Sequence, residues 1–484
     1  MHTRLLRLKS FATLCFTLLL PILSSAQSCD CSAQFQFIKT YFETNNPSFQ
    51  TIKKDPNQYK KYEAAVQKTE RKIAKEPANA NCTFALEDYV SLLHDHHSSV
   101  EQNPGAMHRA KMHSEAELDS FKKSTFYQSF EKLAVDTTKL LESLAQKDVS
   151  DIEGLYLNHE TTVGIYKTGK NKYKGVVLRT KTKFLELGQV MFELKRISED
   201  RYQVTYNLGL LGFSVRSHAK TMTINDGHIY YYGYSKSGKH FEEKKPFEFK
   251  SLNDSTNYMR ISTFNGALTM QLDTFYEAHD AVIRSKPNLI IDLRDNGGGA
   301  DRCFVPLVHY LYTGPIMSDT VDIWVTPENI RRYQEILEEQ QQNKDKYGNA
   351  ATTMGARLEQ MKRAPSNSFI LMDEKAPEPW TIDSIYTNPK KVVLLYNKGT
   401  ASSGEAFIWY AMQSKKVITA GENSGGYMGF GNVMESFSPC DLYKIYNTTT
   451  RYRNFSHYEY VGIEPQHKIP AGKDWIEYAK ELLK

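Results

Sequence analysis

The residue best suited to covalent chemistry is a serine between a predicted strand and a predicted helix. The apolar run Val392–Tyr396 leads through polar and glycine residues to Ser402, Ser403 and Glu405, after which an apolar helical pattern begins. A hydroxyl at such a turn is well placed for nucleophilic attack, and the backbone N–H groups of the helix start can hold developing negative charge. The alternative is an ordinary N-cap, because Ser402 with Glu405 three residues later fits a capping box.

A glycine run follows a second predicted strand. Residues 288–301 read NLIIDLRDNGGGAD, an apolar strand with a charged end that leads into Asn296 and then Gly297, Gly298 and Gly299. Three glycines let the backbone approach a ligand closely and expose its N–H groups. A phosphate loop is the alternative, but the Lys-Ser/Thr ending that such a loop requires is absent. We therefore do not expect phosphate binding here.

Histidines gather at the end of an N-terminal amphipathic helix, where residues 92–99 read LLHDHHSS. Histidine is the side chain whose ordinary pKa best suits a general base near neutral pH, so His94, His96 and His97 are candidates for that role. Two alternative roles are open to such a run, because histidines interact favourably with a helix C-terminus and a surface cluster of them can bind a metal ion.

Changes of composition along the chain predict several structural units and a multidomain α+β fold. Residues 27–146 have apolar residues at three- and four-residue spacing and are predicted to be a helical unit. Short Val- and Tyr-rich runs in 151–250 predict a small antiparallel β domain. Residues 256–484 alternate strand and helix patterns, which predicts an α/β layer. Within it, the charged stretch 327–363 is expected to form a solvated helical hairpin, as a lid or as a plain surface excursion.

Residues 1–26 have the features of a secretory signal. Arg4, Arg7 and Lys9 precede the apolar stretch Phe11–Leu23, and a small-residue Ser-Ser-Ala site follows. The stretch is too short to span a bilayer comfortably, and no later run reaches about 18 apolar residues. We therefore expect an exported protein, periplasmic or extracellular, with no integral membrane segment after cleavage.

The charge of the mature chain argues against two classes of partner. Loss of the signal lowers the formal net charge from +5 to +2, because it removes three basic residues and no acidic ones. So small a charge predicts neither nucleic-acid binding nor attachment to a membrane surface. The oligomeric state is left open.

Five cysteines remain after the signal, namely Cys29, Cys31, Cys82, Cys303 and Cys440. Export permits disulfides, and either Cys29 or Cys31 is a plausible partner for Cys82 within the helical unit. The odd count leaves at least one free thiol. Neither a CxxC repeat nor a Cys/His cluster at zinc spacing is present, so no metal and no cofactor are expected.

Three segments together resemble a known family. DLRDNGGG (292–299), TASSGE (400–405) and GENSGG (421–426) resemble, in order and spacing, the C-terminal-processing or tail-specific serine peptidases. The resemblance covers about Tyr258–Ile469, without the insertion. It implies a crotonase-like α/β catalytic domain.

The resemblance also assigns residues to the reaction. It implies Ser402 as the nucleophile, since the family's serine stands three residues before the motif's glutamate, and an oxyanion hole made by the N–H groups of Ser403 and Gly298. Many members use a lysine five residues after the Gly-Glu pair, and counting from Glu422 that position is Tyr427. A phenol, with an ordinary pKa near ~10, cannot act as the base near neutral pH.

The tricorn-like branch of the family suggests a different base. Its Asp-x-His-Ser/Thr motif matches residues 95–98, which implies His97 as the general base. Its glutamate three residues before a Gly-x-x-Pro motif matches Glu459, ahead of 462–465, and implies that Glu459 orients the histidine. A solvated strand edge is the alternative for this glutamate. The branch's remaining serine has its nearest counterpart in Ser98.

The predicted function is an exported serine endopeptidase without a cofactor, which cleaves polypeptides through an acyl-enzyme on Ser402. A base is needed to activate the hydroxyl, and His97 would supply it. The rival prediction, favoured by the missing lysine, is a degenerate member that binds peptides or an apolar ligand without cleaving.

Overall fold

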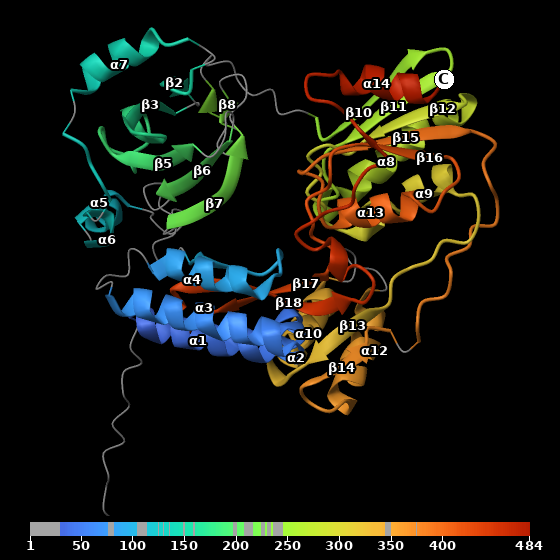
Figure 1. Ribbon diagram of the computed structural model, residues 1–484, viewed down its shortest axis with the longest axis horizontal. Helices are drawn as coiled ribbons and strands as arrows, with labels where there is room; N and C mark the ends of the chain where they lie inside the picture. Colours follow the sequence, from blue (N-terminus) through green and yellow to red (C-terminus); the bar gives the residue numbers. More distant parts are fainter. Residues whose placement is uncertain are drawn as a thin grey trace, which may run out of the picture.

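The chain folds as a multidomain α+β protein, shown in Figure 1. The computed structural model describes residues 30–75, 82–103, 114–123, 125–128, 130–134, 136–148, 151–157, 160–196, 201–207, 216–223, 228–229, 234–235, 245–343, 350–373 and 375–484. The predicted signal (1–26) and Cys29 lie outside the described residues. Across the part that is described, no helix is long and apolar enough to cross a membrane.

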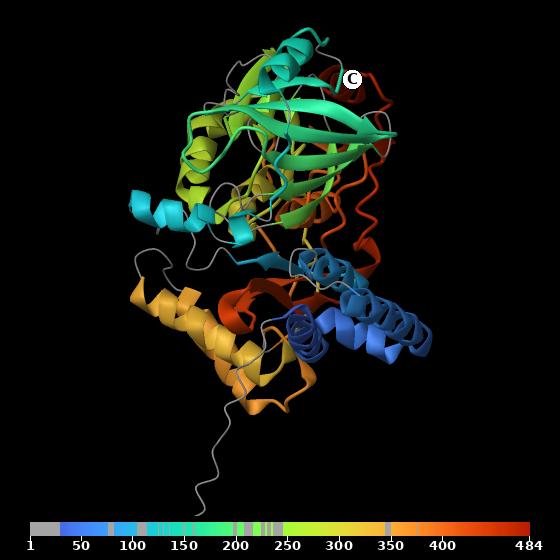
Figure 2. The same cartoon turned by 90° about the vertical axis from the view of Figure 1, so that its left-hand side faces the viewer.

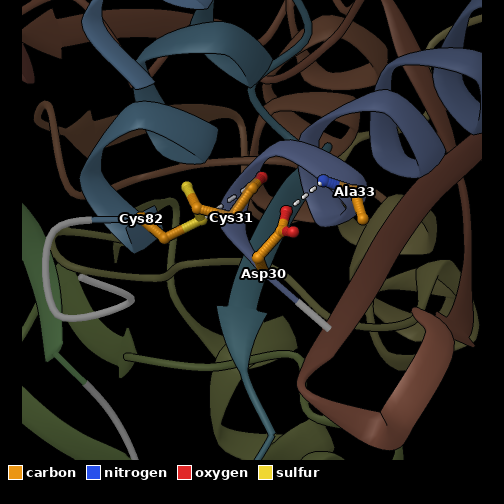
Figure 3. The surroundings of a disulfide bond; sticks show 4 residues. All are labelled: Asp30, Cys31, Ala33 and Cys82. Atoms are coloured by element: carbon orange, nitrogen blue, oxygen red, sulfur yellow. Dashed lines mark hydrogen bonds between the residues drawn. A yellow bond between two sulfur atoms is a disulfide. The ribbon is translucent and has the colours of Figure 1, made fainter. Parts of the chain in front are cut away.

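The N-terminal helices form a compact layer on the β18 strand described below. The helices are α1 (Cys31–Asn45), α2 (Pro47–Lys54), α3 (Pro56–Lys75) and α4 (Cys82–Val90). Asp30 caps α1 by accepting the N–H of Ala33 at 2.9 Å. Cys31 and Cys82 form a disulfide that ties the start of α1 to the start of α4 (Figure 3), which confirms one of the two predicted pairings. Aromatic and aliphatic side chains of all four helices share one buried core.

The β domain is a curled antiparallel sheet with strand order β7-β6-β5-β4-β3-β2-β9-β8. The strands are β2 (Gly154–Leu157), β3 (Thr161–Gly169), β4 (Lys172–Thr180), β5 (Val190–Arg196), β6 (Arg201–Asn207), β7 (Arg216–Thr223), β8 (His228–Ile229) and β9 (Tyr234–Ser235). Three short helices pack on this sheet: α5 (Glu115–Lys123), α6 (Thr125–Gln128) and α7 (Thr137–Ala145). Strand β7 also lies against α4, so the β domain borders the N-terminal helices.

The central sheet of the predicted catalytic half (residues 247–484) has the order β10-β11-β12-β15-β16-β19 and is parallel from β11 onward. Its strands are β10 (Phe247–Asn253), β11 (Thr256–Ile261), β12 (Asn288–Asp292), β15 (Lys391–Tyr396), β16 (Val417–Gly421) and β19 (His467–Lys468). Helices α8 (Thr269–Ser285), α9 (Val305–Leu311) and α13 (Ser403–Ala411) share one core with the sheet, while α14 (Trp475–Leu482) contributes to a second. Covering of both faces explains why these strands are apolar runs rather than alternating ones.

A second sheet joins the N-terminal helices to the catalytic half. Its long strand β18 (Tyr443–Tyr452) pairs along one edge with β17 (Phe430–Phe437) and along the other with β1 (Ser99–Gln102) and then β13 (Val321–Val325). Strand β14 (Ser368–Leu371) pairs with β13. Figures 1 and 2 both show this sheet beneath the central sheet, between the N-terminal helices and the α10–α12 hairpin.

Unit boundaries differ from the sequence predictions in two places. Helices α5–α7 belong to the β domain rather than to the N-terminal unit, because Phe121, Tyr127 and Leu144 are buried in its cores. Strand β10 belongs to the central sheet, with which it pairs, and so lies outside the β domain predicted for 151–250.

The charged insertion is not a free hairpin. Helices α10 (Pro327–Gln342) and α12 (Ala350–Arg363) pack through a buried core, which includes Tyr333 and Leu358, onto strands β13 and β14. Buried Asn329 also donates to the backbone carbonyl of Asn45 at the end of α1, at 3.1 Å. The high charge of the sequence describes only the outer face of these helices.

Candidate active site

The predicted nucleophile stands at a strained turn between β15 and α13. Ser402 has φ +54° and ψ −122°, a conformation that non-glycine residues rarely adopt and that costs on the order of 1–3 kcal/mol. Two backbone bonds hold the turn: Ala401 donates to the carbonyl of Asn296 at 2.9 Å, and Ser402 donates to Glu405 Oε2 at 3.0 Å. The surrounding contacts therefore fix the position of the hydroxyl group.

A buried glutamate organises the loops around this turn. The Glu405 side chain is fully buried and accepts, besides the Ser402 N–H, the Ser424 hydroxyl at 2.5 Å and the backbone N–H groups of Gly426 at 2.8 Å and Tyr427 at 2.7 Å. Burial raises its pKa, and these donors oppose that shift. One carboxylate thus ties the nucleophile's turn to the GENSGG segment.

His97 reaches the serine from the other end of the chain. Its Nε2 lies 3.1 Å from Ser402 Oγ, within hydrogen-bond distance, although 305 residues separate the two. The geometry is that of a base positioned to take the hydroxyl proton. The other two histidines lie elsewhere. The ring of His94 packs against Tyr460 at 5.6 Å, and His96 Nδ1 lies 2.8 Å from the carbonyl oxygen of Gly426.

A buried polar network supports the histidine loop from behind. Asp95, 2% exposed, accepts the backbone N–H of His97 at 3.0 Å through Oδ1. Its Oδ2 accepts the hydroxyls of Ser98 and Thr448, both at 2.6 Å, and the Asn46 amide at 3.1 Å. Ser98 therefore lies in the network behind His97, where its hydroxyl donates to Asp95 rather than facing Ser402.

The two predicted oxyanion donors lie side by side. Gly298 has φ +90°, and a Cβ there would stand 2.6 Å from the carbonyl oxygen of Ala401 and 2.8 Å from the Ser403 nitrogen, so only glycine fits. In this conformation the Gly298 N–H donates to Asn296 Oδ1 at 2.9 Å. To donate to an oxyanion, the Gly298 N–H would have to turn slightly away from Asn296. Such adjustments are common, because hydrogen bonds of unliganded sites often tighten only when substrate binds.

Glu459 lies at the site but contacts the backbone rather than the His97 ring. Its carboxylate accepts the N–H groups of His96 at 2.8 Å and Gly429 at 2.7 Å, and Oε1 is 3.9 Å from His96 Nδ1. Its side chain is 5% exposed, and burial raises its pKa from 4.5 to about 7. The predicted orienter thus holds the residue before His97.

Tyr427 occupies the place where many relatives have lysine. Its ring stacks on His96 at 4.4 Å and meets the edge of the His97 ring at 5.4 Å. Tyr460 covers His96 from another side at 3.5 Å between ring centroids. The tyrosine therefore packs against the histidine pair, which is a role for an aromatic ring rather than for a proton acceptor.

Metal-binding geometry is not found in the part of the chain that the structure describes: no three His, Cys, Asp or Glu side chains are grouped to hold an ion. The Ser402 hydroxyl and His97 Nε2 face each other, and the chemistry that this pair can perform is proton transfer and nucleophilic attack.

Comparison with known proteins identifies the catalytic half. Residues 255–469 match the profile of Peptidase family S41. These residues are an S41 peptidase domain. The match supports a peptidase domain in this part of the chain. No curated protein gives a significant match.

Solved structures similar to this chain are distant. A crystal structure of a protein from Parabacteroides merdae is 20% identical, with 49% of this chain and 64% of that chain covered and a TM-score of 0.32. Mature CPAF complexed with lactacystin is 13% identical, with 94% and 97% covered and a TM-score of 0.46. The photosystem II D1 C-terminal processing protease is 13% identical, with 91% and 93% covered and a TM-score of 0.35. These likenesses are too distant to support a functional conclusion.

The S41 domain does not contain the whole site. It includes Ser402, Gly298 and Glu459, whereas His97 and Asp95 precede residue 255 and reach the domain through the N-terminal unit. Sequence reasoning gave no role to Asp95, although an acid two residues before the proposed base was a usable signal. It could not have found Thr448 or Asn46, whose residue types are common and whose partners are remote in sequence.

Proposed function

We propose that this chain is an endopeptidase that cleaves peptide bonds through an acyl-enzyme on Ser402, with His97 as the general base. The observation that carries the proposal is the 3.1 Å separation of His97 Nε2 and Ser402 Oγ at a strained strand-to-helix turn. A serine hydroxyl is a weak nucleophile at its ordinary pKa, and an adjacent base is the usual means of activation.

The proposed reaction has two steps. Ser402 Oγ attacks the scissile carbonyl while His97 Nε2 takes the hydroxyl proton, and the imidazolium then gives that proton to the leaving amine as the C–N bond breaks. Water, deprotonated by His97, then attacks the acyl carbon; the bond to Ser402 Oγ breaks, His97 returns the proton to that oxygen, and the new carboxyl end is released. The N–H groups of Ser403 and Gly298 would hold the oxyanion in both steps. The Gly298 N–H would first have to turn away from Asn296 Oδ1, to which it donates.

Glu459 is proposed as a positioning residue. Because its carboxylate accepts the N–H of His96, it fixes the backbone from which the His97 ring extends. Asp95 fixes the same loop from the other side through the N–H of His97. Ser98 would act through Asp95, whose carboxylate it supports at 2.6 Å.

Export to the periplasm or the extracellular space is part of the proposal. The Cys31–Cys82 disulfide supports it, because structural disulfides persist mainly in oxidising compartments. The signal-like residues 1–26 agree with this location. Edman sequencing of the mature protein should find a start at or near Gln27 in a periplasmic or culture fraction.

The test is labelling with a fluorophosphonate, with casein cleavage assayed in parallel. Wild type should label and cleave. Ser402→Ala should do neither, and His97→Ala should lose at least about 10³-fold in both rates, as removal of one member of such a relay does elsewhere. His94→Ala, in the same histidine run, is the matched control and should keep wild-type activity.

Other outcomes separate the rival functions. A folded wild type that neither labels nor cleaves would identify the site as a binding site for peptides or an apolar ligand. An active His97→Ala variant would retain Ser402 as the nucleophile and reject His97 as its base.

A further inference from the structure

An unneutralised carboxylate lies beside the proposed nucleophile. Asp301 stands two residues after the last glycine of the run and opens a short 3₁₀ turn, Asp301–Cys303, and its side chain is exposed. This turn packs against the helix α13, which begins at Ser403, one residue beyond Ser402. Neighbouring protein displaces part of its water and so raises the pKa of Asp301.

The available cations near Asp301 are engaged elsewhere. The adjacent Arg302 turns its guanidinium to the hydroxyl of Thr269 at 3.0 Å and the carbonyl of Gly266 at 2.9 Å. Over the residues that the structure describes, no lysine or arginine forms an ion pair with Asp301. A second acid in the neighbourhood, Asp319, differs in this respect: burial raises its pKa, but the N–H of Asn454, which it accepts at 3.0 Å, and the charge of Arg453 oppose that shift.

Partly exposed aromatic rings adjoin this carboxylate. Tyr410 lies seven residues after Ser403 on α13, hence on the same helix face and about 10 Å further along. Phe304, on which Tyr410 packs, donates its backbone N–H to the carbonyl of Asp301 at 3.0 Å. Burial raises the pKa of Tyr410 and Tyr452, and the charge of Asp301 adds to both shifts. Tyr410 packs on Phe304 at 5.7 Å, and Tyr452 stacks on Phe455 at 5.7 Å, so both rings are held firmly.

This combination matches the chemistry of a long cationic side chain. A lysine or arginine of a bound peptide could pair its charge with Asp301 while its aliphatic stem and cationic head lie against aromatic faces. Acidic or neutral side chains would leave the carboxylate unpaired and partly desolvated, which penalises them. Arg302, held by Thr269 and Gly266, would not compete for Asp301.

We propose that Asp301 determines specificity, and that the S41 site prefers polypeptides with a lysine or arginine side chain next to the scissile bond. The inference rests on the proposed peptidase function and specifies its substrate class. Asp301 would touch the substrate's side chain and take no part in proton transfer.

The experiment first maps cleavage sites in a peptide library by mass spectrometry and then compares matched peptides. The chosen sequence is made N-acetylated and C-amidated, with lysine or with Nε-acetyl-lysine at the mapped position. Wild type should cleave the lysine peptide at least about tenfold faster in kcat/KM. Asp301→Asn should reduce that ratio to within about twofold of one while it keeps its kcat/KM on the acetyl-lysine peptide.

Two further variants sharpen the test. Asp301→Lys should favour a glutamate peptide over the lysine peptide. Asp295→Asn is the matched control, since it removes the same charge from an exposed acid of the same glycine-rich segment and should preserve the lysine preference.

The possible results are distinct. A wild type that cleaves without preference for a cation, or an Asp301→Asn variant that slows both peptides equally, would overturn the specificity proposal and leave the peptidase standing. Asp301-dependent cleavage of an unblocked neutral peptide would show that the α-amino group, not a side chain, is the cation bound, and would overturn the side-chain assignment. A wild type that fails to cleave any peptide and fails to label would overturn the peptidase function and the inference with it.

Discussion

Replacing Glu459 with glutamine should change how the stability of the catalytic half depends on pH. Burial raises the pKa of this carboxyl from its ordinary 4.5 to about 7. Each pKa unit corresponds to about 1.4 kcal/mol, so the difference is worth roughly 3 kcal/mol. Its side chain is 5% exposed, so solvent screening reduces this figure little.

The sign follows from which state binds the proton. Between about pH 4.5 and pH 7 the folded protein keeps Glu459 protonated while the unfolded chain has lost that proton, so this residue's contribution to the free energy of unfolding is largest below pH 4.5 and falls as pH rises to about 7. Glutamine does not titrate. The free energy of unfolding of Glu459→Gln minus that of wild type should therefore increase by roughly 3 kcal/mol from pH 4.5 to pH 8.

Urea unfolding followed by tryptophan fluorescence measures this difference in the right part of the molecule, because all four tryptophans lie after residue 320. The variant also carries a pH-independent offset, since an amide cannot accept both N–H groups that the carboxylate accepts. Glu464→Gln is the control: its side chain is 66% exposed, and its difference from wild type should stay constant with pH within about 0.5 kcal/mol. A Glu459→Gln difference that is equally flat would refute the reasoning, because it would mean that burial does not raise the pKa of Glu459.

Three further predictions concern residues around the site. Asp95→Asn should lower kcat by about 10- to 100-fold with little change in KM, because His97 loses its anchor; unchanged steady-state kinetics would contradict this. Tyr427→Phe should keep kcat/KM within about twofold, since only the ring packs on the histidines, and a loss above about tenfold would instead assign a role to the phenol. Cys31→Ser should lower the free energy of unfolding by about 4 kcal/mol in urea, as expected for a 51-residue loop closed to Cys82, and reductant should then have no further effect; an unchanged midpoint would argue that the disulfide contributes no stability.

Local sequence patterns predicted the elements that carry Ser402 and Gly298. An apolar strand, a turn with glycine and hydroxyl residues, and an apolar helix specify their own conformation within about 25 residues, and the observed β15 and α13 follow that pattern. The close approach of the glycine run to a neighbouring group could also be predicted from local sequence, since only glycine fits a backbone this close to Ala401 and Ser403.

Contacts between distant segments could not be read from such patterns. The Glu459 carboxylate binds the N–H of His96, and only tertiary structure decides whether an acid meets a ring or the backbone beside it. The helices at 115–145 showed ordinary amphipathic spacing, which indicates that they bury a face but not that the face lies on the β domain. Likewise the many charged residues of 327–363 led to the prediction of a solvated hairpin and gave no indication that its apolar residues pack in a buried core.

The same long-range contacts make the position of the base depend on how the N-terminal unit docks. Asp95, Asn46 and Thr448 come from three segments, and their polar groups are buried and bonded to one another. Separating the segments would leave several of these groups unpaired, each costing about 1–3 kcal/mol if it stayed buried. Pairing of β1 with β18 adds main-chain bonds directly after Ser98. The S41 domain on its own therefore carries the proposed nucleophile, while the histidine that would activate it is held in place by the assembled chain.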